Sequence, residues 1–165
     1  MRSTLALLSD THGFIPEALF EHIKGLPVLH AGDIGTRQVL ERLQARGPVH
    51  AVRGNVDGSE FYDLPMTLCL ELAGKRIALI HNAGWPQRPH PAALDLVRKQ
   101  QAEVLVYGHT HVCMVARHEE TLWINPGAAG NLGHHEERSA ALLHIEEDGT
   151  LSLERILLGA RFSTR

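Results

Sequence analysis

The segment "VLVYGHTHVC", Val104 to Cys113, joins a buried strand to a pair of histidines. Its first four residues are apolar and mostly branched, which is typical of a strand covered on both faces. A glycine follows, and His109 and His111 come directly after it with one residue between them. Two imidazoles at a strand end can bind a metal ion, but loop chemistry explains them equally well in a chain with twelve histidines. The rest of the sequence has to distinguish these interpretations.

Composition predicts one domain with its own hydrophobic core. The chain has 165 residues, 44% of them hydrophobic, so we expect a single domain over residues 1–165. Two cysteines, Cys69 and Cys113, are too few for a disulfide framework and fit a reducing, cytoplasmic location. The first apolar run ends at Asp10, too early for a signal peptide, and no run is long enough to span a membrane. A formal net charge of −3 gives no general attraction to nucleic acid.

The first half of the sequence alternates between segments typical of strands and segments typical of helices. Short apolar runs are separated by two helical patterns, one with Pro16 in its first turn and one opened by Thr36. This alternation predicts a parallel sheet with crossover helices. The expected strands are Ser3–Ser9, Leu26–Ala31 and Pro48–Gly54, and the expected helices are Ile15–Gly25 and Thr36–Gly47.

The second half is mostly strand, with one helix. Apolar runs joined near Ala73-Gly74, Glu119-Glu120 and Asp148-Gly149 are typical of antiparallel strand pairs. The expected fold class is therefore α/β with an α+β-like second half, in which two sheets pack together and helices lie outside. The segments are strand pairs over Met66–Asn82, Val112–Gly127 and Ser139–Leu158, a helix over His90–Gln101 and a strand over Glu103–Gly108.

Acidic, amide and imidazole side chains follow five of the expected strands. A single His or Asp after a strand is commonly a turn or cap residue. In open α/β sheets, however, ligands bind outside the carboxyl ends of the strands, so five successive strand ends favour one shared site. The residues are Asp10, His12, Asp33, Asn55, His81, His109 and His111.

This set of nitrogen and oxygen donors suits two divalent ions better than one. A catalytic zinc ion uses about three protein ligands, whereas seven are available here. Two ions about 3.5–4 Å apart can clamp the attacking and leaving oxygens of a phosphoryl transfer. The mixture of carboxylate, amide and imidazole favours manganese, with zinc, iron, nickel or cobalt as alternatives, over calcium or magnesium.

The motifs "DTHG", "GDIG", "GNVD" and "GHTH" occur in this order between residues 10 and 111, with the strand-terminal His81 before the last. Together they resemble the successive motifs of the calcineurin-like metallophosphoesterase superfamily. The later "NPGA" at Asn125 resembles that family's "NPGS" turn, and the compact length is similar to its small phosphodiesterase subgroup. The resemblance implies a metallophosphoesterase fold, a sandwich of two mixed β-sheets flanked by helices, in agreement with the segment pattern.

The resemblance also implies a role for each candidate ligand. A metal-bound hydroxide would attack phosphorus, while the ions and Asn55 stabilise the negative charge on the phosphoryl oxygens. The first ion would be bound by Asp10, His12 and His111, the second by Asn55, His81 and His109, and Asp33 would bridge the two.

The sequence departs from the family pattern directly after Asn55. Many members have a histidine there, proposed to protonate the leaving alkoxide, whereas this chain has Val56. Small-subgroup members often lack that histidine too. Without it, we expect activity towards esters with good leaving groups, or water as the acid. Asn82 and Ala128 replace a usual glycine and serine next to the expected pocket.

Three further residues are candidates for substrate binding. The planar guanidinium of Arg53 suits a substrate phosphate, although a surface ion pair explains this residue equally well. Trp85 and Arg88 follow His81 and suit the border of a base or leaving-group site, although a tryptophan that packs its own loop is the simpler interpretation. For His30, within the second expected strand, we expect a hydrogen-bonded core position rather than a metal ligand.

The predicted function is a dinuclear metal-dependent phosphoesterase that acts on small phosphorylated substrates, with phosphodiesters preferred to monoesters. The diester preference rests on the resemblance and on Val56. The main alternative is a non-enzymatic scaffold like a retromer coat subunit of this fold, which has lost a metal-site histidine, whereas all seven positions are present here. A nuclease is disfavoured by the net charge of −3. A homo-oligomer formed through edge strands is an alternative to a monomer.

Overall fold

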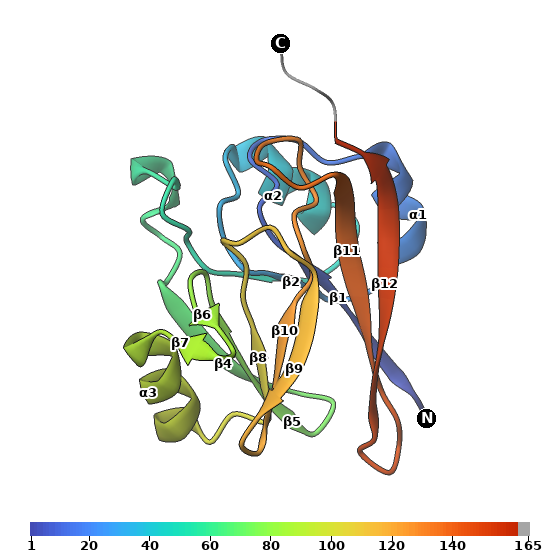
Figure 1. Ribbon diagram of the computed structural model, residues 1–165. Helices are drawn as coiled ribbons and strands as arrows, with labels where there is room; N and C mark the ends of the chain where they lie inside the picture. The colour runs from blue at the N-terminus through green and yellow to red at the C-terminus, as the bar shows by residue number, and fades with distance from the viewer. Residues whose placement is uncertain (162–165) are drawn as a thin grey trace.

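The first of two five-stranded sheets combines the parallel strands of the first half of the chain with its last hairpin (Figure 1). The computed structural model describes residues 1–161. The strands of this sheet, in spatial order, are β12 (Leu151–Ala160), β11 (Glu137–Ile145), β1 (Ser3–Leu8), β2 (Val28–His30) and β3 (Val49–Ala51). β1, β2 and β3 are parallel, as the alternating pattern predicts, while β11 pairs antiparallel with both β1 and β12.

The second sheet is also mixed, with three parallel strands inside and an antiparallel strand at each edge. Its strands, in spatial order, are β4 (Thr67–Leu72), β5 (Lys75–Ile80), β8 (Val104–Val106), β10 (Thr121–Asn125) and β9 (Met114–His118). β5, β8 and β10 are parallel, and β4 and β9 run antiparallel to their neighbours. The expected pair of mixed sheets is therefore confirmed.

Helices cover the outer faces of both sheets (Figure 1). α1 (Glu17–Ile23) and α2 (Arg37–Gln44) are the crossovers of the first sheet, and α3 (Pro91–Gln100) connects β5 to β8. In α2 the buried residues Val39, Leu40 and Leu43 follow the helical period, which gives the helix one apolar face for the sheet. Among residues 1–161 no helix is long and apolar enough to cross a membrane.

Three short elements were not predicted from the sequence. They are the two-residue strands β6 (Gly84–Trp85) and β7 (Arg88–Pro89), which pair with each other, and the 3-10 helix η1 (Ser59–Phe61). Elements of two or three residues are too short to produce a hydrophobic period, so the sequence carries no pattern for them.

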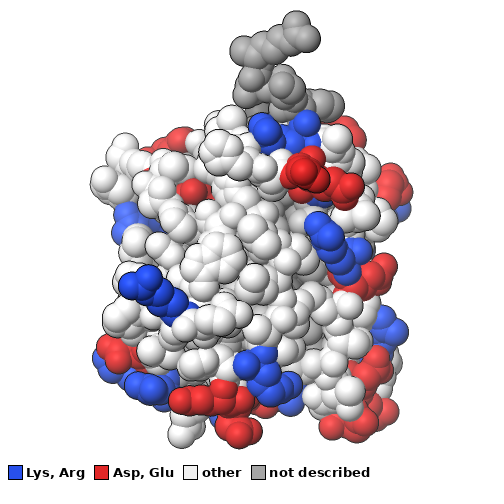
Figure 2. All heavy atoms as spheres, viewed as in Figure 1, with Lys and Arg blue, Asp and Glu red and all other residues white. Residues whose placement is uncertain are grey.

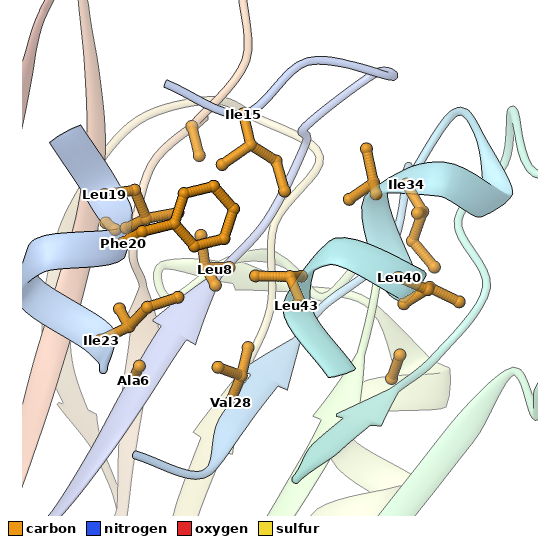
Figure 3. Packing of buried hydrophobic residues seen from close by; sticks show 14 of the residues in the cluster. Ala6, Leu8, Ile15, Leu19, Phe20, Ile23, Val28, Ile34, Leu40 and Leu43 are labelled. Carbon is orange, nitrogen blue, oxygen red and sulfur yellow. The ribbon is translucent and has the colours of Figure 1, made fainter. Parts of the chain in front are cut away.

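The alternation of side chains along β1 builds two core layers at once. Leu5 and Leu7 pack between the two sheets, whereas Ala6 and Leu8 pack beneath α1 and α2 (Figure 3). Leu7 and Leu8 are both fully buried, and burial of such a side chain contributes about 1.5–3 kcal/mol. Because β1 is anchored on both faces, the residues directly after it are held in a fixed position.

Candidate metal centre

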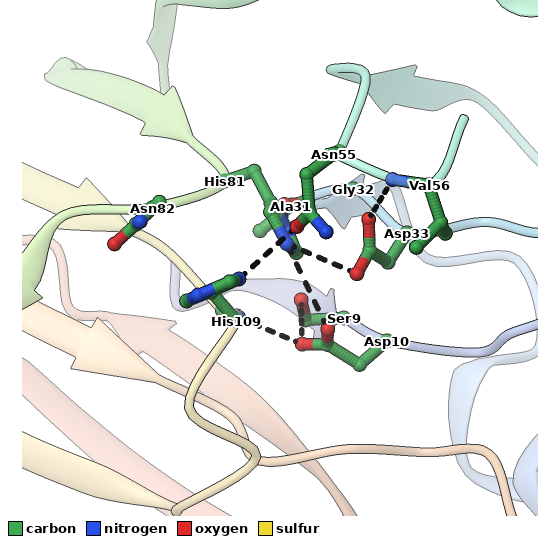
Figure 4. A network of polar contacts seen from close by, with 12 residues as sticks. Ser9, Asp10, Ala31, Gly32, Asp33, Asn55, Val56, His81, Asn82 and His109 are labelled. Carbon is green, nitrogen blue, oxygen red and sulfur yellow. Dashed lines mark hydrogen bonds and ion pairs between the residues drawn. The ribbon is translucent and has the colours of Figure 1, made fainter. Parts of the chain in front are cut away.

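The loops after β1, β2, β3, β5 and β8 meet at one edge of the sandwich (Figure 4). The structure brings all of the predicted ligand residues to this edge. Their ionisable members form two groups in which the ligand atoms lie within 4.8 Å of one another. The first group is Asp10, His12 and His111, and the second is Asp33, His81 and His109.

Asp10 supplies the carboxylate of the first group. It is fully buried, and its Oδ2 accepts hydrogen bonds from Ser9 Oγ at 2.6 Å and from the His109 backbone N–H at 3.0 Å. Its Oδ1 therefore faces the imidazoles and lies 3.2 Å from His111 Nε2 and 3.8 Å from His12 Nε2. Burial raises the pKa of Asp10, but the imidazoles of His111 and His81 outweigh burial and hold the pKa below its ordinary value.

Asp33 lies between the two groups. Its Oδ2 is 3.2 Å from His81 Nε2 in the second group and 3.7 Å from His12 Nε2 in the first. Its Oδ1 accepts a hydrogen bond from the Val56 backbone N–H at 3.1 Å, which fixes the orientation of the carboxylate. Burial raises the pKa of Asp33, but the adjacent His81 and the Val56 N–H together outweigh burial and hold the pKa below its ordinary value. The carboxylate is therefore ionised near neutral pH.

His81 and His109 complete the second group together with Asn55. His81 Nδ1 donates to the Ala31 carbonyl at 2.8 Å, because a carbonyl can only accept, and this leaves Nε2 directed at Asp33. His109 Nδ1 lies 3.1 Å from Asn55 Oδ1, and the rings of His81 and His109 are 5.2 Å apart. Burial lowers the pKa of His81, but Asp33 and Asp10 raise it by a larger amount. The carboxylates thus favour a cation at this point.

Three buried polar atoms at the centre, Asp10 Oδ1, His12 Nε2 and His81 Nε2, lie near side chains of opposite charge but form no well-aligned hydrogen bond in the described part of the chain. A buried polar atom without a partner costs about 1–3 kcal/mol, and native proteins rarely leave several together. A carboxylate oxygen and two imidazole nitrogens are the donors that divalent transition metals bind. The residues present therefore fit bound metal ions, which would satisfy Asp10 Oδ1 and His12 Nε2 in the first group and His81 Nε2 in the second.

Asp57 supports the centre, although it is not among the residues predicted from the sequence. Its buried carboxylate accepts hydrogen bonds from the backbone N–H groups of Ile34 at 2.9 Å, Gly35 at 3.0 Å and Gly54 at 2.8 Å. It thereby ties the loop after Asp33 to the loop that carries Asn55. The signal was the acidic residue at the end of "GNVD".

Asn125 supports the "GHTH" loop in a similar way. It ends β10, the parallel neighbour of β8, and its side-chain Nδ2 donates to the Gly108 carbonyl at 3.1 Å and to Thr110 Oγ1 at 3.0 Å. These bonds hold the backbone on either side of His109. The motif "NPGA" is the sequence signal for this residue, which stands at the end of a sixth strand.

The glycines of the motifs are required for two reasons: a sharp turn of the backbone, or neighbouring atoms that leave no room for a Cβ. A glycine directly before a strand-end ligand predicts a sharp turn, and Gly32 has this geometry, with a φ of +98°. Gly54 and Gly108 have no positive φ. A Cβ at Gly54 would instead overlap the side chain and backbone of Asp33, and a Cβ at Gly108 would overlap Ser9 Oγ. For these two glycines the expectation of a turn was wrong, and the reason is lack of space.

The three candidate substrate residues lie in two places. Arg53 is half-buried near Asn55, its guanidinium lies over the Tyr62 ring at 5.0 Å from the centroid, and it forms no ion pair with a carboxylate among residues 1–161. Trp85 and Arg88 face each other across the β6–β7 hairpin, with Trp85 42% exposed.

His30 is buried and hydrogen-bonded, as expected. Thr11 Oγ1 lies 3.0 Å from its Nε2, and the Gly32 N–H donates to its Nδ1 at 3.1 Å. Burial lowers the pKa of His30 to about 4, so the ring is neutral.

Comparison with known proteins identifies the family. The model of the calcineurin-like phosphoesterase superfamily domain matches residues 4–148. A probable metallophosphoesterase of Methanothermobacter thermautotrophicus is 32% identical over 130 residues, which cover 75% of this chain and 76% of that protein. The chain therefore belongs to the calcineurin-like phosphoesterase superfamily.

Solved structures share the fold at lower identity. A predicted phosphoesterase from Streptococcus pneumoniae has a TM-score of 0.76 and 24% identity, with 96% of this chain and 91% of that chain covered. Vps29 from Chaetomium thermophilum has a TM-score of 0.74 and 17% identity, with 96% and 97% covered, and this protein has also been solved with a cyclic peptide. An archaeal phosphodiesterase has a TM-score of 0.70 and 18% identity, with 93% and 99% covered. These likenesses show a common fold.

Proposed function

We propose that this member of the calcineurin-like phosphoesterase superfamily hydrolyses phosphate esters at a centre of two divalent metal ions. The observation that carries the proposal is the position of Asp33, which faces an imidazole of each ligand group. A carboxylate shared by two groups is the arrangement that a two-ion phosphoesterase requires.

We assign the ligands as two sets joined by one residue. The donors are oxygen and nitrogen without thiolate, so manganese is our first choice of metal, with zinc, iron, nickel or cobalt as alternatives. The first ion is assigned to Asp10, His12 and His111, the second to Asn55, His81 and His109, and both to Asp33.

The chain's own residues then orient the substrate. When bound, the ions supply Lewis-acid polarisation of phosphoryl oxygens and a lowered pKa for water. Asp10 and Asp33 are kept ionised, so they hold the cations, while Ser9 and Val56 fix the two carboxylates by hydrogen bonds. Asn55 is exposed at the rim, where its amide can face a phosphoryl oxygen, and we also assign Arg53 to substrate binding.

Phosphodiesters are the proposed preferred substrates. Val56 is 52% exposed and its side chain has no proton to give, so the leaving group must depart without help from this position. An ester with a good leaving group meets that condition. The structural likeness to an archaeal phosphodiesterase supports the same choice through the fold.

The test is a hydrolysis assay on metal-stripped protein to which Mn²⁺ is restored. We expect cleavage of bis(4-nitrophenyl) phosphate to exceed cleavage of 4-nitrophenyl phosphate, and the stripped protein to be inactive. Zinc, iron, nickel and cobalt are compared in the same assay. Failure to cleave both esters with every metal would contradict the proposal, and faster monoester cleavage would contradict only the diester preference.

The proposed partner is a small phosphorylated molecule rather than bulk nucleic acid. On the face drawn in Figure 2, basic and acidic side chains are interspersed at the margins around a largely uncharged centre. That face has no continuous basic stripe of the kind that binds a phosphate backbone. Cys69 and Cys113 are free thiols, which supports a cytoplasmic location. A homo-oligomer is tested by light scattering.

The second candidate function is a scaffold that binds a partner protein. The observation that favours it is the fold shared with Vps29. The complete ligand set favours the enzyme, because a scaffold does not require two converging metal groups. A protein that binds two metal ions and hydrolyses no ester would favour the scaffold.

A further inference from the structure

An open pocket of about 360 Å³ adjoins the second metal group. Its walls come from the loop that carries Asn55, the start of β4, the end of β5 and the start of α3. Asn55 and His81 belong both to this pocket and to the proposed metal centre. The volume falls in the range of roughly 300–1,000 Å³ that is usual for small-molecule sites. A substrate bound at the metals would therefore have one part inside the pocket.

The walls of this pocket are largely apolar. Met66, Ile80 and Ala92 line it, and Met66 is 55% exposed. No acidic residue lines the pocket, so it offers no partner for an organic cation. Its character is that of a site for a neutral, weakly polar group.

The start of α3 does not turn the pocket into a second anion site. Pro91 has no N–H, and the N–H groups of the next three residues are already bonded to His90. Ala92 N–H donates to His90 Nδ1 at 3.4 Å, while Ala93 and Leu94 donate to the His90 carbonyl at 3.0 and 3.2 Å. With these amides occupied, the helix end has no free donor for a phosphate.

The polar groups of the pocket are donors that suit a ring with acceptor atoms. Arg53 lines the pocket, and a guanidinium stacks well on flat rings. Because His90 Nδ1 accepts a hydrogen bond, a neutral His90 carries its proton on Nε2. Asn82 Oδ1 accepts from the Gly84 N–H at 3.0 Å, which leaves its amide N–H groups for a ligand.

We propose that this pocket binds a flat, weakly polar ring, of nucleobase size or smaller, that is part of the ester whose phosphoryl group lies at the metals. The proposal rests on the proposed function, because it places the phosphoryl group between the two ligand groups. It narrows the substrate class to phosphate esters that carry an aromatic or heteroaromatic group.

The test compares phenylphosphonate with methylphosphonate on the Mn²⁺-loaded protein by isothermal titration calorimetry. Neither carbon–phosphorus bond is hydrolysed, so the measurement does not depend on activity. We expect phenylphosphonate to bind at least about tenfold more tightly, because burial of an apolar ring favours binding. Equal affinities, or no binding of either phosphonate, would overturn the proposal.

Variants that fill the pocket test whether the phenyl ring binds there. Ala92→Trp, at the second residue of α3, and Thr67→Trp, at the first residue of β4, both fill the pocket from exposed positions. Ala18→Trp is the matched control, since Ala18 is an exposed second residue of α1. We expect the two pocket variants to lose the phenyl preference while keeping methylphosphonate affinity and Mn²⁺ stoichiometry, and the control to keep the preference.

The outcomes separate the two proposals. If both pocket variants keep the phenyl preference, the ring binds elsewhere and the pocket assignment is wrong. A protein that cleaves bis(4-nitrophenyl) phosphate but binds both phosphonates equally refutes the pocket alone. A protein that prefers phenylphosphonate but cleaves no ester refutes the proposed hydrolysis alone.

Discussion

The metal-centre loops and the turns elsewhere both place non-glycine residues at positive φ, but for different reasons. At the centre these residues are Asp10, His12, Asp33, His109 and His111, with φ between 45° and 71°. Elsewhere among residues 1–161 they are Ala73, Gln101 and Glu119, in two turns and a helix end. Such a residue costs on the order of 1 kcal/mol.

The two regions differ in whether the strained backbone is necessary. In a turn, the left-handed residue only reverses the chain, so a better-suited residue can replace it. At the centre, the left-handed residues are the proposed ligands themselves, and their conformation aims each side chain at a shared point. The following experiments test this contrast, from the largest expected effect to the smallest.

Asp33→Asn should have the largest effect. The substitution keeps the shape of the side chain but removes the negative charge that faces both groups. We expect the metal stoichiometry to fall from two to none and hydrolysis to fall by more than about 10³-fold, since several kcal/mol of charge stabilisation are lost. Atomic emission on dialysed protein measures the metal. Full stoichiometry in the variant would mean that Asp33 is not the bridge.

His109→Ala and His111→Ala should weaken different ions. His109 lies beside Asn55 and His81, whereas His111 lies beside Asp10 and His12. We expect each variant to keep one tight site and to weaken the other by about 10–100-fold or more. Metal titrations followed by calorimetry distinguish the two variants when each is combined with Asn55→Ala. Adding Asn55→Ala should cause little further loss of metal binding in His109→Ala and a large further loss in His111→Ala. Equal additivity would contradict the two-set assignment.

Asp57→Ala should loosen the loops without removing a ligand. Three backbone N–H groups lose their buried acceptor, so we expect the free energy of unfolding to fall by about 2–4 kcal/mol. Asp63→Ala is the matched control, because Asp63 is an exposed carboxylate paired with Arg37, and its loss should change the free energy of unfolding far less than the loss of Asp57. Urea unfolding measures both. Similar losses in the two variants would contradict a supporting role for Asp57.

The buried His30 should make the free energy of unfolding depend on pH. Its folded pKa is about 4, against an ordinary value of 6.5, because of burial. Below pH 6.5 the unfolded chain binds a proton that the folded chain excludes, so this residue lowers stability as the pH falls from 6.5 towards 4. The effect is on the order of 3 kcal/mol. Urea unfolding of the metal-free parent and of His30→Gln measures this effect. The free energy of unfolding of the parent, relative to that of the variant, should decrease from pH 6.5 towards pH 4. A difference that does not change with pH would contradict the prediction.

Ala73→Asn should have the smallest effect, and it should stabilise. Ala73 and Gly74 have φ of 50° and 74° in the β4–β5 hairpin, and Asn-Gly is the preferred pair for such a turn. We expect a gain of about 0.5–1 kcal/mol in thermal or urea unfolding, with unchanged metal binding. His12→Gly relaxes a similar φ of 45° but should lose metal affinity. A destabilised Ala73→Asn variant would show that this turn carries no removable strain.

Several features of the fold were not predictable from sequence patterns. The final hairpin was recognisable from its apolar runs around Asp148-Gly149, but nothing in those runs says that β11 pairs with β1. The partner of a strand depends on packing across the whole core, which a local period does not report. For the same reason the motifs "GNVD" and "NPGA" contain Asp57 and Asn125 without indicating their hydrogen-bond partners, which only the folded chain places around them.

The sequence by itself determined the longer strands, the three α-helices and the residues at the strand ends, because side-chain period and strand-end chemistry are local properties. Tertiary structure decided how those residues are grouped. Asp10 receives a hydrogen bond from His109, 99 positions away, and Asp33 lies between the two groups only because both sheets direct their parallel strands to one edge. The pocket beside His81 arises in the same way, from four segments that are distant in the sequence.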